Sequence, residues 1–174
     1  MQWWKGKMLS RAGKEVLIKA IAQSIPTYMM GVFLLPARLC NELNALCARF
    51  WWGQTRDKRK IHWKNWGVLS HPKKEGGMGF RDLKDFNLAM LAKQGWRLIQ
   101  ENDSLLYKCF KAWYFPRFHF LDALDVPNSS YMWKSLMAAQ PNLKLGFCWT
   151  VGDGSAIRVI ADKWIPHQIT NQVL

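Results

Sequence analysis

The stretch PKKEGGMGFRDLKDFNLAMLAKQGWRL, residues 72–98, places two lysines and a glycine cluster directly before a helical run. The spacing of the apolar residues predicts a helix that is capped by Asp85 and continues to about Gln100. The residues expected on one face of this helix are Leu88, Leu91, Gly95 and Leu98. A helix of this length makes a mainly α fold the natural expectation for the chain.

The glycine cluster raises the question of a phosphate-binding loop. The pattern GxxxxGK[ST] has no match, and a GxGxxG motif starting at Gly77 would need glycine at position 82, where the chain has Asp82. We therefore predict that the glycines form a tight turn with positive φ. Lys73 and Lys74 can still contact nucleic-acid phosphates as point charges.

Further helices are predicted on both sides of this segment. Their expected ranges are about 10–24, 26–35, 36–52, 104–115 and 130–139, where serine or proline stands at each start. In the third of them, Leu39, Leu43, Leu46 and Phe50 form the expected core stripe. Cys40 and Cys47 lie beside it and are predicted to pack in the core, because half a zinc site would lack two partners.

The C-terminal part has a different pattern. FCWTVGDGSAIRVI, residues 147–160, alternates apolar and polar residues around a Gly-Asp-Gly turn, which predicts a β-hairpin. We therefore expect a helical bundle with a small C-terminal β-hairpin. Residues 1–120 would form a basic helical region, and residues 121–174 a connector helix with the hairpin subdomain.

The net charge of +13 is unevenly distributed. Residues 1–52, 53–75 and 76–120 carry excess charges of +5, +5 and +3, whereas residues 121–174 are neutral. Such a bias favours a polyanionic partner, most often a nucleic acid. A basic surface without a partner remains the alternative.

The sequence contains no catalytic pattern that we recognise. The four histidines are scattered without an HExxH motif, and helix capping explains Asp82 and Asp85. Two-metal nucleotidyl transfer needs converging carboxylates, and no Asp-Asp pair occurs in the chain. We therefore predict neither catalytic nor metal-binding residues, and no cofactor.

Basic residues interleaved with tryptophans are the strongest functional signal. Lysine and arginine attract phosphates without regard to sequence, and exposed rings can stack on unpaired bases. Alternatively, the tryptophans belong to the core and only the charges face solvent. The predicted phosphate contacts are Arg56, Lys58, Arg59, Lys60, Lys64, Lys73 and Lys74, with Arg81, Lys84 and Lys93 as a second set.

Five segments together resemble the region after the polymerase palm in reverse transcriptases of plant LINE-type (non-LTR) retrotransposons. They are LSRAGKEVLIKAIAQSIPTYMMGVFLLP (9–36), FWWG (50–53), IHWKNW (61–66), GGMGFRDLKDFNLAMLAKQGWRL (76–98) and WTVGDGSAIRVIADKWIP (149–166). The resemblance implies a thumb-like helical region and the connector toward the family's zinc-binding segment. It also implies that the catalytic aspartates and magnesium ions belong to a palm that precedes this chain.

We therefore predict a non-catalytic fragment of an RNA-directed DNA polymerase. Its expected partners are RNA or an RNA–DNA hybrid duplex and the missing palm domain. A decayed fragment or packing module without activity, and an independent binding module, remain alternatives. The sequence shows no signal peptide, and its apolar run 28–35 is too short for a membrane span, so we expect an intracellular protein, nuclear or cytoplasmic, with no membrane partner.

Overall fold

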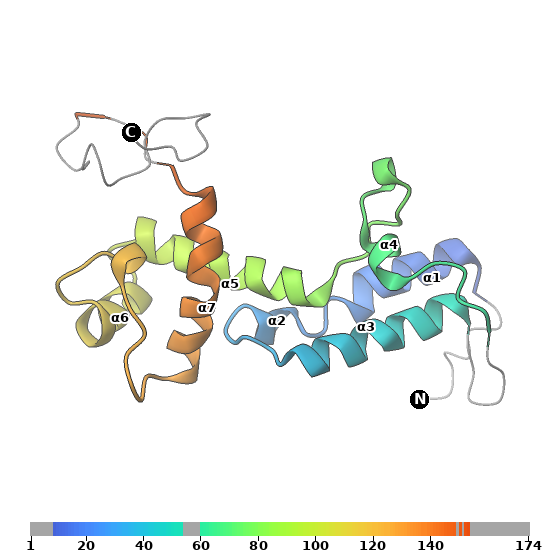
Figure 1. The fold of residues 1–174 in the computed structure, drawn as a ribbon, viewed down its shortest axis with the longest axis horizontal. Helices are drawn as coiled ribbons and strands as arrows, with labels where there is room; N and C mark the ends of the chain where they lie inside the picture. Colours follow the sequence, from blue (N-terminus) through green and yellow to red (C-terminus); the bar gives the residue numbers. More distant parts are fainter. Residues whose placement is uncertain (1–8, 54–59, 149, 151, 154–174) are drawn as a thin grey trace.

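The computed structural model describes residues 9–53, 60–148, 150 and 152–153. This part is mainly α, as predicted. Its helices are α1 (Arg11–Leu17), the π-helical turn η1 (Ile18–Ala22), α2 (Thr27–Met30), α3 (Ala37–Trp52), α4 (Trp66–Ser70), α5 (Leu83–Gln100), α6 (Leu105–Tyr114) and α7 (Tyr131–Gly146), with short 3-10 turns η2 (Lys73–Glu75) and η3 (Phe120–Asp122). The long helix α5 joins two groups of helices, α1–α4 at one end and α6–α7 at the other (Figure 1).

Side-chain caps fix the start of most of these helices. Ser10, Ser104 and Ser130 each accept a hydrogen bond from a backbone N–H of the first turn, as predicted. The predicted cap of α5 was wrong, because Asp82 accepts from the N–H of Lys84 and the helix already begins at Leu83. Asp85 lies in the first turn instead, where its negative charge interacts favourably with the positive end of the helix dipole.

The predicted core stripe of α3 is confirmed in part. Leu43 and Phe50 pack against core clusters, whereas Leu39 and Leu46 are 41% and 54% exposed. Cys40 and Cys47, on the face beside the stripe, are buried. Small side chains on this face allow α3 to approach its neighbours closely, and the larger Leu46 lies at the edge of a groove. The core position predicted for both cysteines is confirmed, and burial raises the pKa of both thiols.

Asn87 connects α5 to the chain between α2 and α3. Its side chain is 1% exposed and donates from Nδ2 to the carbonyls of Met30 (2.8 Å) and Phe33 (3.0 Å). Its Oδ1 accepts from the N–H of Leu35 at 2.7 Å. One buried amide therefore satisfies three backbone groups at and beyond the C-terminal end of α2, where the helix provides no partner for them.

At the other end of the molecule, α7 crosses α5 at Gly95. A Cβ at this position would lie 2.5 Å from Leu143 Cδ1 and 3.0 Å from Phe120 Cε1, so glycine allows this close contact and a larger residue would require the Leu143 side chain to shift. The core beside the crossing is built on Trp133, which is fully buried and stacks on Tyr114 with ring centroids 4.4 Å apart.

Helix α7 continues past the predicted end near Ala139 and contains Pro141. Proline removes one backbone donor but the helix persists, because contacts on both sides of it hold the last turns. Gln140 Nε2 donates to the carbonyls of Phe120, Leu121 and Ala123, and Leu143 packs against the Trp133 core.

The predicted β-hairpin lies largely outside the described residues, and the described part of the chain contains no strand. The Trp133 core draws residues from both sides of position 120, among them Leu98 and Leu136. The division of the chain at that position stays a prediction. Within the described ranges, no helix combines the length and the apolar character that a membrane span requires.

Candidate nucleic-acid interface

The glycine loop is a tight turn with positive φ, as predicted, and it folds back on the end of α4. Gly76 and Gly79 have positive φ values of 80° and 66°, and a Cβ on Gly77 would lie 2.0 Å from the carbonyl oxygen of His71. The N–H groups of residues 76–79 donate to backbone carbonyls of residues 73, 72, 69 and 71. They are therefore not available to cradle a phosphate.

Beside this loop, a hollow of about 550 Å³ lies between α3 and residues 62–66. Three of its lining residues, Arg49, His62 and Lys64, carry basic side chains. The His62 ring stacks on Trp52 with centroids 5.9 Å apart, which orients the imidazole. Trp66 also lines the hollow, and its buried indole N–H has no acceptor among the described residues. A hollow with this lining is suited to an anionic group.

A second group of cations lies at the C-terminal end of α3. A Cβ on Gly53 would lie 3.0 Å from Lys14 Nζ and 3.5 Å from Lys60 Nζ, so both ammonium groups approach the same point. Burial, followed by the charges of Lys60 and Arg11, lowers the pKa of Lys14. The negative end of the helix dipole partly offsets this repulsion, and a bound anion would offset it further.

The Glu15 carboxylate forms ion pairs with two other lysines. Its Oε1 accepts from Lys19 Nζ at 2.7 Å and lies 3.1 Å from Lys73 Nζ, and these two hydrogen bonds lower the pKa of the Glu15 carboxyl. Lys19 Nζ also donates to the carbonyl of Met78. Lys73, a predicted phosphate contact, is therefore already paired with a carboxylate.

The remaining predicted contacts are not drawn into one group by the structure. Lys74 is exposed, and the Arg81 guanidinium lies over the Phe86 ring at 4.5 Å. Lys84 and Lys93 are both exposed on α5, but they are nine positions apart, so they lie on opposite sides of the helix. Arg56, Lys58 and Arg59 lie outside the described residues.

Comparison with known proteins places this chain in a family. The chain is 38% identical over 143 residues to the "Uncharacterized mitochondrial protein AtMg00310" of Arabidopsis thaliana, and the match covers 82% of this chain and 93% of that protein. The chain belongs to the family of this mitochondrial protein. No protein-family model and no solved structure matches it.

A longer relative of this chain is the "Putative ribonuclease H protein At1g65750" of Arabidopsis thaliana. It is 36% identical over 172 residues, which are 95% of this chain and 27% of that protein. The chain thus spans about a quarter of the length of this relative.

The tryptophans of this family member divide into core and surface. Trp133 is fully buried, and Trp51, Trp52 and Trp66 are half-buried around Phe80 and α3. The core interpretation is therefore confirmed for Trp51, Trp52 and Trp66, three of the four tryptophans that are interleaved with the basic residues. In contrast, Trp63, whose chain neighbours His62 and Lys64 line the hollow, is 77% exposed, and Trp113 is 80% exposed on α6.

Sequence reasoning missed Arg11, Lys14 and Arg49 as members of the basic surface. Lys14 precedes Lys60 by 46 positions, so only the packing of α1 beside α3 brings them together. No local signal in the sequence marks this proximity. The described residues also include no group of three or more His, Cys, Asp or Glu side chains that could hold a metal ion.

Proposed function

We propose that this chain is a retroelement-derived segment that binds the phosphate backbone of RNA or of an RNA–DNA hybrid duplex and has no catalytic activity of its own. The observation that carries the proposal is the gathering of basic side chains at the end of α3. Arg49, His62 and Lys64 line one hollow, and Lys14 and Lys60 approach each other at Gly53. The close approach of the two lysine ammonium groups is unfavourable by itself, and a bound polyanion would offset their repulsion.

The finer assignment is a thumb-like part of a LINE-type reverse transcriptase. The sequence resemblance supports it, and so does the relation to a longer protein named as a ribonuclease H protein. In this proposal the magnesium ions belong to a palm domain, which is a further partner, and no residue of this chain binds them.

The proposal is tested by fluorescence-anisotropy titration of an RNA–DNA hybrid duplex with the purified chain. Neutralising about six phosphates gives an affinity loss of about a thousandfold between 50 and 200 mM salt. Lys64→Gln should lower the slope of log K against log salt by about 0.9, whereas Lys134→Gln, an exposed lysine on α7, should leave it unchanged. A folded chain that does not bind at 50 mM salt contradicts the proposal.

A second candidate function is that of a packing module within a longer polypeptide. An apolar groove of about 240 Å³ lies between η1 and α3, and its walls include Ile21, Ile25 and Leu46, which are 44%, 75% and 54% exposed. The chain spans only 27% of the longer relative, so other parts of such a polypeptide are the natural occupant of the groove. This candidate predicts that the isolated chain self-associates through the groove.

A further inference from the structure

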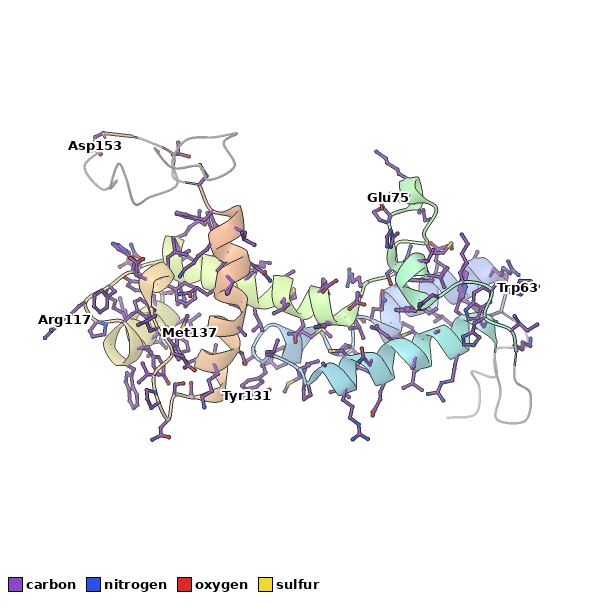
Figure 2. All side chains as sticks on the ribbon, in the orientation of Figure 1. Trp63, Glu75, Arg117, Tyr131, Met137 and Asp153 are labelled. Carbon is purple, nitrogen blue, oxygen red and sulfur yellow. The ribbon has the colours of Figure 1, made fainter. Side chains whose placement is uncertain are left out.

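Two neighbouring features at the end of α3 are not explained by phosphate contacts alone. Trp63 is 77% exposed, although a ring of this size is normally buried to a large extent. Its chain neighbours on both sides, His62 and Lys64, line the basic hollow. Figure 2 shows Trp63 at the end of the molecule opposite Arg117.

We propose that Trp63 and the hollow lined by Arg49, His62 and Lys64 form a site for one unpaired nucleotide, whose base stacks on the indole and whose phosphate lies in the hollow. The inference rests on the proposed function and adds a preference to it. The chain would bind a duplex that ends in a single-stranded overhang more tightly than a blunt duplex.

The chemistry of the residues supports both halves of this site. A base offers a π-face to an exposed indole whatever its identity, and such stacking is sequence-tolerant. Arginine and lysine supply charge-assisted donors for phosphate oxygens.

Trp113 provides a control that distinguishes base stacking at this site from nonspecific binding to any exposed ring. It is 80% exposed, as much as Trp63, but it lies on α6 at the other end of the molecule. Trp113→Ala therefore removes an equally exposed ring and leaves the hollow intact. It serves as the matched control.

The test measures the affinity of the whole chain for three probes: a blunt RNA–DNA hybrid duplex, the same duplex with a short single-stranded overhang, and the single strand alone. The wild type should prefer the overhang, and Trp63→Ala should weaken overhang binding by about 5- to 150-fold while leaving blunt-duplex binding within about twofold. Trp63→Phe should restore part of the preference, and Trp113→Ala should retain all of it.

The possible failures are distinguishable. If the wild type binds none of the probes at low salt, both the proposed function and this inference are wrong. If it binds blunt and overhanging duplexes equally, or if Trp63→Ala weakens both by the same factor, backbone binding stands and the nucleotide site is overturned. Circular dichroism of each variant checks that the helices are intact, which we expect because Trp63 is exposed.

Discussion

Lys73 and Glu15 form an ion pair that ties η2 to α1, with Lys73 Nζ 3.1 Å from Glu15 Oε1. Because Lys19 contacts the same oxygen at 2.7 Å, one carboxylate offsets two cations of the basic surface. The Lys73 side chain is 68% exposed, so the pair itself adds little to stability, about 1 kcal/mol at most. Its larger effect is on the charge available to a nucleic acid.

Glu15→Gln should therefore tighten binding to an RNA–DNA hybrid several-fold and make it more salt-sensitive, because Lys19 and Lys73 become available to phosphates. Glu42→Gln is the matched control, since Glu42 pairs with Arg38 on α3 at 2.9 Å in a similar i, i+4 arrangement. Equal tightening by both variants would show an effect of net charge alone and contradict the role of the Glu15 contacts.

The same carboxylate predicts a pH dependence of stability. Hydrogen bonds from Lys19 and Lys73 lower the pKa of Glu15 from its usual 4.5. A lowered carboxyl pKa stabilises the fold above the unfolded-state pKa, and this stabilisation is lost as pH falls through the folded-state value. Urea unfolding should therefore show that the wild type loses more stability than Glu15→Gln as the pH falls below about 5.

Much of the helical framework could be predicted because its signals are local. Ser10, Ser104 and Ser130 stand at the helix starts, and the glycines of residues 76–79 form the predicted turn. Helix α3 shows where such signals end. Of the predicted stripe, Leu43 and Phe50 pack in the core but Leu39 and Leu46 are exposed, because the width of the buried face is set by the packing partners of the helix.

The candidate site was predictable only in part for the same reason. The basic residues interleaved with tryptophans in the sequence included Lys60 and Lys64, which do lie near the end of α3. Lys14 and Arg49 join them through tertiary packing, and Glu15 pairs with Lys73 across 58 positions. Neither relationship can be recognised from the spacing of residues along the sequence.

Asn87→Ala should lower the free energy of unfolding by about 3 kcal/mol, because three backbone groups of residues 30–35 lose their partner in a buried place. Urea denaturation followed by circular dichroism measures the change. Asn44→Ala is a suitable comparison, since Asn44 is also buried but its Oδ1 has no partner among the described residues. It should cost about 1 kcal/mol or less, and an equal loss in both variants would contradict the bridging role of Asn87.

Gly77→Ala should disrupt the turn beside the basic hollow. Its Cβ would meet the backbone carbonyl of His71 at 2.0 Å, and a backbone atom cannot move aside as a side-chain end can, so we expect a loss of about 3 kcal/mol. Gly67→Ala in α4 is the control, because a Cβ there has no neighbour within 4 Å and alanine favours a helix. Thermal unfolding should separate the two variants clearly, and similar melting temperatures would show that the turn can relax.

Leu46→Lys tests whether the apolar groove is an interaction surface. Leu46 is 54% exposed at the groove, so a charge there should change the stability of the folded chain by only about 0.5 kcal/mol while preventing apolar contact across the groove. If the groove is covered in a longer polypeptide, the isolated wild-type chain self-associates and Leu46→Lys shifts it toward the monomer in light-scattering measurements. Leu39→Lys places the same charge on an exposed position of α3 that does not line the groove and should leave self-association unchanged. A wild type that is monomeric at every concentration, or two variants that behave alike, would remove the groove as the cause and with it the packing function.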